Sequence, residues 1–536
     1  MRRESISALS RAAVLVAACL LINACGNGGG GDGPSAPAPP APPPPPAPST
    51  VDGPAWWNFG RDSQHAAQSE IATQSILRIV WQMPMDLVPP YRGNNVLAIH
   101  YGSPVISRRD TVLVPVKLNR DGGFRVEARA GANGGLLWSA PTDYVLPAHD
   151  WTPSYNIALT HGNRVYFPGA GGKLYFRDDV DSATGMVQTV VFYGSHAYEL
   201  APAAYDAAVR INTPLTIDPR GNVYFGFIVI GATPIGLQSG IARVAPDGTA
   251  NWVSVAAASN NTLLTKVAMN SAPALSADLS TLYVVVTDAP PAGARPWGML
   301  LALDAQTLAT RGQIELRDPA TGARAWISDN GSSSPSVAPD GDVYYGVLES
   351  NAPAHNFRGW LLHFDASLTV SKLPGSFGWD QTVSFAPRSM VPQYTGPSSY
   401  LVVSKYNNYF GIGSGNGRNQ MAILDPAQNQ IDTISAISVM REVLTILGPT
   451  PEFGQPGTLG AVREWCVNTT AVDPATSSIL VNSADGRLYR WHLPSNQLTQ
   501  NVRFNNGYLE SYTPTAIGPD GKVYAINNAT LFAVGQ

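Results

Sequence analysis

The stretch TPLTIDPRGNVYFGF, from Thr213 to Phe227, shows the pattern that decides the fold of this chain. A Thr-Pro pair leads into a short strand, the tetrapeptide DPRG supplies turn-forming residues, and a second strand rich in valine and aromatic residues follows. This order predicts a β-hairpin. The same pattern returns in SPSVAPDGDVYYGV from Ser334 and in TPTAIGPDGKVYAI from Thr513.

Looser copies complete a series of eight repeats, and they begin near Ser103, Thr152, Ala272, Ala386 and Thr469. Most copies are followed by a second hairpin, as in GIARVAPDGTANWVS from Gly240 and GRLYRWHLPSNQL from Gly486. Four strands per repeat with alternating apolar and polar residues are typical of a propeller blade. We therefore predict an all-β fold, a single β-propeller of about eight four-stranded blades.

The two ends of the repeat region predict how the ring closes. The eighth repeat stops at Leu531–Val534, which would be its third strand, so a fourth strand is missing there. The segment LRIVWQ, residues 77–82, has the character of a closing strand and precedes the first repeat. An N-terminal strand that completes the last blade would remove exposed sheet edges. We interpret five tryptophans as packing residues between blades: Trp56, Trp57, Trp81, Trp138 and Trp252.

The repeats resemble those of the quinoprotein-like (PQQ-repeat) propellers, and in repeat type also the BamB-like lipoproteins of the outer-membrane assembly machinery. The idealised repeat runs from a Val-Tyr strand through Leu-Tyr-Ala-Leu-Asp-Ala to Thr-Gly and a closing Trp. The resemblance covers nearly everything from Trp56 to Gln536, and WWNFGRDSQH, residues 56–65, is similar to the segment that precedes the blades in these proteins. It implies the propeller fold and leaves the function open.

The N-terminus has the features of a lipoprotein signal peptide over residues 1–24. Arg2 and Arg3 precede an apolar run, which ends in the sequence LINAC at Cys25. This segment resembles a bacterial lipobox, so we expect Cys25 to be lipidated; Gly26 after it favours the outer membrane. An ordinary secretory peptide with an incidental cysteine is the alternative, and Cys19 is a weaker lipidation site.

A Gly/Pro-rich segment over residues 25–54 is expected to be a disordered linker, and the propeller domain is expected to span 55–536. Charged residues are 13% of the chain and the net charge is -4, which excludes a basic surface for nucleic acid. Of the three cysteines, Cys466 alone falls in the propeller region, so no intramolecular disulfide is expected there.

The connections between strands differ on the two faces of the predicted ring. The first-to-second and third-to-fourth turns are short, such as PRGN from Pro219. The second-to-third and blade-to-blade connections are elaborated over residues 231–239, 288–297, 351–358, 406–419 and 438–464. Long loops on one face of a rigid scaffold are where binding usually takes place.

Candidate binding residues lie on that same face. Those expected at the mouth of the channel are His100, His149, Asp150, Arg210, Asn270, Asp329, Asp380, Arg463, Glu510 and Tyr512. Tyr406, Asn408 and Tyr409 would form an aromatic and amide platform for a sugar or a peptide. The alternative interpretation is that the channel residues satisfy one another, and that the Tyr406 loop packs on itself. Linear spacing defines no catalytic residue and no metal site.

Three hypotheses about function follow. The first is a non-enzymatic, envelope-anchored propeller that binds a protein or polymer partner without a cofactor. The second is a quinoprotein oxidoreductase; the resemblance implies PQQ and Ca²⁺ for it, but the adjacent cysteines and the Cys-x-x-Cys-His segment of such enzymes are absent from the sequence. The third is a propeller that binds or acts on a polysaccharide.

Overall fold

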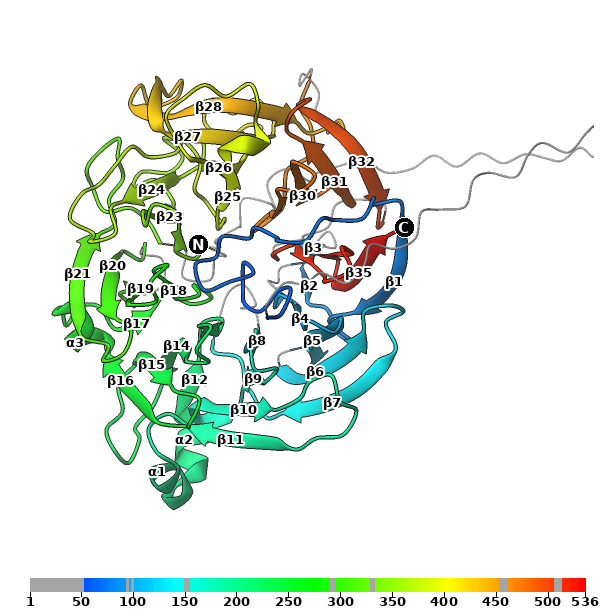
Figure 1. Cartoon of the computed structure of the whole chain (residues 1–536). Helices are drawn as coiled ribbons and strands as arrows, with labels where there is room; N and C mark the ends of the chain where they lie inside the picture. The colour runs from blue at the N-terminus through cyan, green and yellow to red at the C-terminus, as the bar shows by residue number, and fades with distance from the viewer. Residues whose placement is uncertain are drawn as a thin grey trace, which may run out of the picture.

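Eight small antiparallel sheets stand around a common centre in the computed structural model of this chain (Figure 1). The structure describes residues 53–92, 96–97, 101–120, 122–148, 155–289, 295–327, 333–452, 460–505 and 513–536. Each sheet is one blade, and the shortest strand of each blade lies next to the centre. The prediction of a single eight-bladed propeller is confirmed.

The first four blades follow one another along the chain. Blade 1 contains β4 (Val105–Ile106), β5 (Thr111–Asn119), β6 (Gly122–Ala130) and β7 (Leu136–Thr142). Blade 2 contains β8 (Ala158–Leu159), β9 (Val165–Pro168), β10 (Lys173–Arg177) and β11 (Val187–Val191). Blade 3 contains β12 (Val209–Ile211), β13 (Thr216–Ile217), β14 (Val223–Val229), β15 (Gly240–Val244) and β16 (Ala250–Ser254). Blade 4 contains β17 (Lys266–Val267), β18 (Ala274–Leu275), β19 (Thr281–Thr287), β20 (Gly298–Asp304) and β21 (Thr310–Glu315).

The other four blades complete the ring. Blade 5 contains β22 (Ser336–Val337), β23 (Val343–Val347) and β24 (Trp360–Phe364). Blade 6 contains β25 (Ser384–Pro387), β26 (Tyr400–Tyr406), β27 (Gln420–Ile431) and β28 (Ser438–Leu447). Blade 7 contains β29 (Ala471–Asp473), β30 (Ser478–Asn482), β31 (Arg487–His492) and β32 (Gln497–Arg503). Blade 8 contains β33 (Ala516–Ile517), β34 (Val523–Asn527), β35 (Thr530–Gly535) and β1 (Arg78–Pro84).

A few elements lie outside the blades. The hairpin of β2 (Tyr91–Arg92) and β3 (Val96–Leu97) precedes blade 1. The helices are α1 (Ser195–Leu200) and α2 (Pro202–Ala208) between blades 2 and 3, and α3 (Val255–Ser259) after blade 3. Two 3₁₀ turns cover Ala170–Gly172 and Arg388–Met390. The repeat pattern gave no expectation of helices, because they lie in connections outside the blades.

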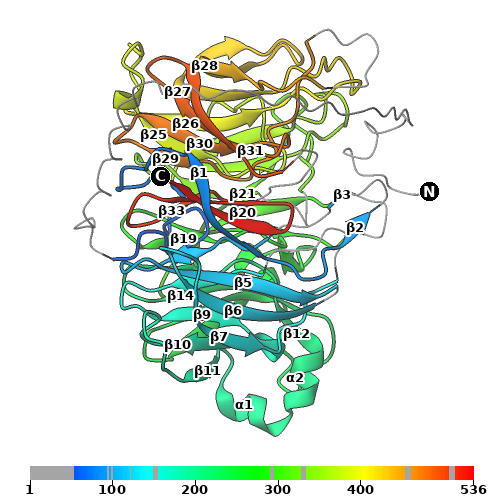
Figure 2. The same cartoon turned by 90° about the vertical axis from the view of Figure 1, so that its right-hand side faces the viewer.

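The ring closes as the sequence predicts. Strand β1 pairs with β35 of the last blade, with Arg78 opposite Gly535 and Pro84 opposite Thr530. Figure 2 shows β1, in blue, beside the red C-terminal strands. The indole of Trp81 is buried, and its Nε1–H donates to the carbonyl of Gly131 in blade 1 at 2.8 Å. The closing strand therefore also joins blade 8 to blade 1.

Apolar side chains of neighbouring blades fill the space between the sheets. Of the five tryptophans interpreted as packing residues, Trp56, Trp81 and Trp138 are buried, and Trp57 is half-buried and packs on His161. Trp252 lies on the outermost strand β16 and is 37% exposed, and its ring contacts Phe227 of the same blade, so its interpretation as a packing residue between blades is not supported.

Residues 56–74, which we call the strap, run around the centre of the ring and contact all eight blades, seven of them at the inner strand (Figure 1). Seven inner strands donate the N–H of their second residue to the strap. The pairs are Ile106 to Trp56 O, Leu159 to Trp57 O, Ile217 to Asn58 Oδ1, Leu275 to Ser63 O, Val337 to Gln64 O, Phe385 to Ala66 O and Val472 to Ala67 O, at 2.7–3.2 Å. At blade 8, Gln74 N–H donates to Gly521 O at 2.8 Å.

The strap solves a problem that each inner strand has by itself. An inner strand pairs on one side only, so its other edge leaves backbone groups without partners. The strap supplies acceptors for them, and the Asn58 amide both accepts from Ile217 N–H and donates to Ile217 O at 2.7 Å. Burial lowers the pKa of His65 to about 4, so its ring is neutral and Nδ1–H donates to Pro335 O.

Two expectations about the connections are wrong. Residues 438–464 were expected as one long loop, but β28 occupies the first ten of them because an apolar outer strand is hard to tell from a loop by pattern alone. Blade 5 was expected to have four regular strands, and its sheet has three. Its fourth position is taken by an irregular segment with bridges from Leu361 to Gly375 and from Phe364 to Ser371.

The short-turn face contains a carboxyl group with a raised pKa. Asp110, in the turn between β4 and β5, lies near Asp520 in the turn of blade 8. Burial, and after it the charge of Asp520, raises the pKa of Asp110 to about 6. The ionised form is therefore disfavoured in the folded state, and stability is lost as pH rises from about 4 through 6.

We expect Asp110→Asn to stabilise the fold at pH 7 by about 2 kcal/mol and to have little effect near pH 4. The amide removes the charge and tolerates the positive φ of 63° at this position. Thermal unfolding of both proteins at the two pH values is the measurement. A variant that is less stable than the parent at pH 7 would show that the ionised carboxylate is favoured in the fold.

Candidate functional site

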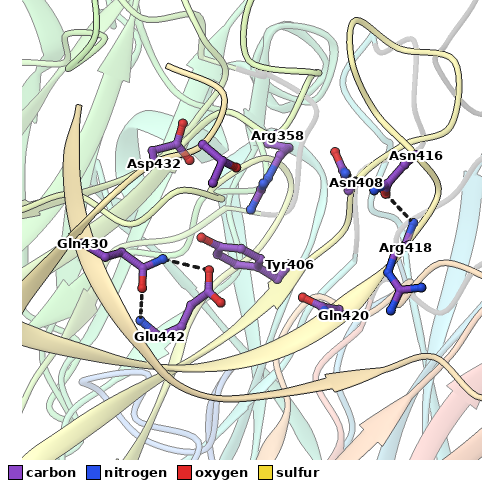
Figure 3. A pocket seen from close by; sticks show the side chains of 10 residues that line it. Arg358, Tyr406, Asn408, Asn416, Arg418, Gln420, Gln430, Asp432 and Glu442 are labelled. Carbon is purple, nitrogen blue, oxygen red and sulfur yellow. Dashed lines mark hydrogen bonds between the residues drawn. The ribbon is translucent and has the colours of Figure 1, made fainter. Parts of the chain in front are cut away.

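A pocket of about 200 Å³ lies between blades 5 and 6, on the face of the long connections (Figure 3). It is bordered by the β23–β24 connection, the β26–β27 connection and the outer hairpin of blade 6. Its lining side chains are Arg358, Tyr406, Asn408, Asn416, Arg418, Gln420, Gln430, Asp432, Thr433 and Glu442. Apart from Tyr406, every one of them is charged, an amide or a hydroxyl.

The outer hairpin of blade 6 reaches this place because β27 is irregular. The pairing of β27 with β28 shifts register between Asp425 and Asn429, and such a bulge bends a strand. Beyond the bulge, Met440 N–H donates to Pro374 O at 2.8 Å, at the outer edge of blade 5. The hairpin therefore covers the outer edge of the irregular segment that takes the fourth position of blade 5, and it forms one wall of the pocket.

Asp432, at the end of this hairpin, is a fully engaged acceptor. Its carboxylate lies 3.3 Å from His355 Nε2 and accepts from Ser376 Oγ at 2.5 Å, and it also accepts from the N–H and hydroxyl of Ser435. Burial alone raises the pKa of Asp432, but the hydrogen bonds from His355, Ser376 and Ser435 outweigh it and hold the pKa well below its usual range. Asp432 therefore fixes the hairpin against blade 5.

Arg358 stands at the centre of the pocket, and Figure 3 shows it over the ring of Tyr406. Its guanidinium carbon is 4.1 Å from the ring centroid, which is the geometry of a cation–π contact. Burial comes first in raising the pKa of Tyr406 to about 12, so the phenol is neutral. The backbone of Arg358 is fixed, because its carbonyl accepts the N–H groups of Gly378 and Trp379.

The remaining walls are held by amide groups. Gln430 Nε2–H donates to Glu442 Oε1 at 2.9 Å, and Glu442 N–H donates to Gln430 Oε1 at 2.9 Å. On the other wall, Asn356 Nδ2–H donates to Asn408 Oδ1 at 3.2 Å. Asn408 Nδ2–H donates to Asn416 Oδ1 at 2.8 Å. Hydrogen bonds between the β23–β24 and β26–β27 connections thus define the shape of the pocket.

The structure brings two of the predicted site residues together here. Tyr406 and Asn408 line the pocket. Tyr409 instead packs inward, with its ring 6.4 Å from that of Phe377, and burial raises its pKa well above the usual value. The three residues therefore do not form one platform: Tyr406 and Asn408 belong to the pocket wall, and Tyr409 packs beneath it.

The other described site residues lie apart from the pocket. The guanidinium of Arg210 donates to Val209 O at 2.9 Å, and Asn270 N–H donates to Asn212 O at 2.8 Å. The Asp380 carbonyl accepts from Lys405 Nζ at 2.7 Å. Arg463 pairs with Glu452 at 2.8 Å. Six predicted binding residues and the predicted lipidation site lie outside the described residues: His100, His149, Asp150, Asp329, Glu510, Tyr512 and Cys25.

Polar groups of neighbouring blades bond to one another beside the channel. Ala272 N–H donates to Ser334 Oγ at 2.9 Å, and Ser334 N–H donates to Thr382 Oγ1 at 3.0 Å. Thr469 Oγ1–H then donates to Thr382 O at 3.1 Å. These contacts, like the Asn270 bond, join neighbouring blades near the inner strands.

Sequence reasoning missed the hairpin residues of the pocket, namely Gln430, Asp432 and Glu442. Gln430 lies in the third strand and Asp432 in the turn after it, where the repeat pattern predicts ordinary blade structure, and Glu442 falls in the segment 438–464 that was expected as a loop. The one local signal is DPAQN, residues 425–429, which interrupts the apolar alternation of β27. Arg358 is the last residue of the expected loop 351–358. Its position over Tyr406 could not be predicted, because Arg358 belongs to blade 5 and Tyr406 to blade 6.

The described residues do not match the cofactor site that the quinoprotein resemblance implies. Among them, no three histidine, cysteine or acidic side chains are grouped so that they would hold a metal ion. The full sequence contains no adjacent cysteines that would form a disulfide beneath a quinone. No step through a quinone is therefore derived for this chain.

With its fold and pocket, the chain is an eight-bladed β-propeller of the architecture found in quinoprotein dehydrogenases. Similar solved structures include a europium-containing methanol dehydrogenase, with a TM-score of 0.54 and 10% identity over 89% of each chain. A quinohemoprotein alcohol dehydrogenase from Comamonas testosteroni has a TM-score of 0.51 and 14% identity over 90% of this chain and 81% of its own. The quinohemoprotein alcohol dehydrogenase ADHIIG from Pseudomonas putida HK5 also has a TM-score of 0.51, with 13% identity over 90% and 76%.

At these identities the similarity concerns the fold alone. No protein-family model and no curated protein matches the sequence. Among the helices of the described residues, none is long and apolar enough to cross a membrane. The function must therefore be argued from the residues of the site.

Proposed function

We propose that this chain is an outer-membrane lipoprotein whose propeller binds a protein or polymer partner of the cell envelope. The observation that carries the proposal is the polar pocket, which two long connections and a bent hairpin build on one face of the ring. On the opposite face, the strap forms hydrogen bonds with the inner strands. We therefore assign that face a structural role. Binding rather than chemistry fits a site whose described acids are engaged in hydrogen bonds.

The test is site-specific photo-cross-linking in intact cells. A photoreactive residue replaces Asn416, which is exposed at the pocket rim, and the matched control replaces Arg220, which is exposed in a turn of the opposite face. We expect adducts with an envelope component from position 416 and none from 220. Equal adducts from both positions, or none from position 416, would contradict the proposed binding face. Dye-linked oxidation of alcohols or sugars after reconstitution with PQQ and Ca²⁺ would favour an enzyme instead.

The anchor is tested separately, by Cys25→Ser. Lipidation needs the thiol, so we expect the variant to leave the membrane fraction while its circular dichroism and melting temperature match those of the parent. Membrane fractionation followed by immunoblotting is the measurement. If the variant stays with membranes after signal cleavage, the lipoprotein assignment is wrong.

A further inference from the structure

Arg358 is a buried cation whose hydrogen-bonding capacity is unused within the fold. The residue is 5% exposed, and its Nε and Nη2 atoms are buried without a hydrogen-bond partner. Among the described residues, no carboxylate forms an ion pair with it. A buried charge without a partner is costly, so a fold keeps one where a ligand supplies the opposite charge.

The acidic groups of the same pocket do not serve this purpose. Asp432 accepts from His355, Ser376 and Ser435, which occupy its oxygens. Glu442 accepts from Gln430 through Oε1. The guanidinium lies over the face of Tyr406, a contact that uses none of its N–H groups, and Nε and Nη2 have no hydrogen-bond partner. A planar fork of N–H donors matches a carboxylate with two parallel hydrogen bonds.

The rest of the lining is suited to hydroxyl groups. Four amide side chains, Asn408, Asn416, Gln420 and Gln430, and the hydroxyl of Thr433 supply donors and acceptors around Arg358. The volume of about 200 Å³ is below the range of about 300–1,000 Å³ that holds drug-sized ligands, so the pocket accommodates one ring-sized unit. No aliphatic side chain lines it, which disfavours the apolar side chain of a peptide terminus.

We propose that this pocket binds one acidic sugar residue of an envelope polysaccharide, with the sugar carboxylate on the guanidinium of Arg358 and its hydroxyls on the surrounding amides and Glu442. The inference rests on the proposed binding function and names its ligand class. Arg418, exposed at the rim, adds a second cation for the neighbouring acidic unit of the chain.

The test measures affinity by isothermal titration calorimetry with three probes: trigalacturonate, the neutral maltotriose, and N-acetyl-alanyl-alanine with its free carboxylate. We expect the parent protein to bind trigalacturonate best. Arg358→Met should weaken this binding at least about tenfold, because a charge-assisted, two-pronged contact is lost. The melting temperature should not fall, because the variant removes a buried charge that has no partner.

The control is Arg388→Met, since Arg388 of blade 6 also lies over a tyrosine, Tyr394, at 5.7 Å, but is exposed on the opposite face. It should leave trigalacturonate binding unchanged. Arg358→Lys, which keeps the charge without the fork, should restore only part of the affinity. Equal binding of maltotriose, preference for the dipeptide, or an unchanged affinity of Arg358→Met would each overturn the inference. A fall in melting temperature in Arg358→Met, with parent-like binding, would assign Arg358 a structural role.

The two proposals fail separately. If trigalacturonate does not bind but position 416 still forms adducts in cells, the ligand class is wrong and the binding face stands. If neither experiment gives a signal, the proposed function itself is wrong.

Discussion

Deleting residues 53–84 is expected to abolish cooperative folding of the whole propeller, and not only to loosen its first residues. The deletion removes β1, the outer strand of blade 8, and it also removes the strap, which bonds to the inner strands of seven blades and to a turn of the eighth. Each hydrogen bond contributes on the order of 1 kcal/mol, and the loss of a buried tryptophan such as Trp56 or Trp81 costs about 3–5 kcal/mol. The sum exceeds the 5–15 kcal/mol by which a typical domain is stable, so we expect no folded state.

Circular dichroism and thermal unfolding of the truncated protein are the measurements. Deletion of residues 26–50, which lie before the strap, is the matched control and should leave the melting temperature unchanged. The large deletion is expected to give no folded state, so its loss of stability cannot be measured. The variant Asn58→Ala is expected to stay folded and gives a measurable loss. The amide is fully buried and makes two bonds with Ile217, so its loss should cost about 1–3 kcal/mol. A cooperative transition near the parent melting temperature after the large deletion would mean that the ring closes without the strap.

Lys117→Met is expected to destabilise the protein by about 3–5 kcal/mol. Lys117 and Asp86 form an ion pair at 3.0 Å, and their side chains are 2% and 0% exposed. Asp86 lies just after β1 and Lys117 lies in β5, so the pair joins the closing blade to blade 1. Among the described residues, the substitution leaves this buried carboxylate with the hydroxyl of Tyr101 at 3.2 Å and the N–H of Val88 as partners. An uncompensated buried charge is what makes such a change costly.

Chemical denaturation at equilibrium measures this loss. The double variant Asp86→Leu, Lys117→Met should recover most of the stability, because it removes the stranded charge together with its partner. The control is Arg311→Met, which breaks the exposed ion pair with Asp304 and should cost under about 1 kcal/mol. If the double variant is no more stable than Lys117→Met, the loss of stability comes from the missing ion pair and not from the unpaired Asp86 carboxylate.

The local pattern of the repeats accounts for most of the architecture. The inner strands of the clearest copies lie where the Ser/Thr-Pro and turn signals place them, as at Thr216–Ile217 and Ala516–Ile517, and the looser copies supply the others. These signals are reliable because turn residues and alternating strands act over a few neighbours. The closing strand was predictable as well, since the last repeat has three strands and Trp81 lies in a segment that supplies the fourth.

The candidate site was predictable only in part. Tyr406 and Asn408 were identified because they lie in a long connection on the expected face. The same reasoning treats residues 406–419 as a loop on that face, but the Asn407 side chain bonds to the N–H and carbonyl of Trp465. This connection is therefore fixed to the next blade by residues that are 58 positions apart in the sequence.

By itself the sequence determined the blade count, the closure of the ring and the face that carries the long connections, because these follow from short-range patterns repeated eight times. The tertiary structure decided the path of the strap and the place of the pocket. The strap contacts seven blades through equivalent backbone N–H groups, which leave no mark on the side-chain pattern. The pocket needs a bulge at residues 425–429 to bring Gln430 and Asp432 into its lining, and it needs blade 5 to present Arg358 over the ring of Tyr406. Packing between blades, and not the local sequence, sets these distances.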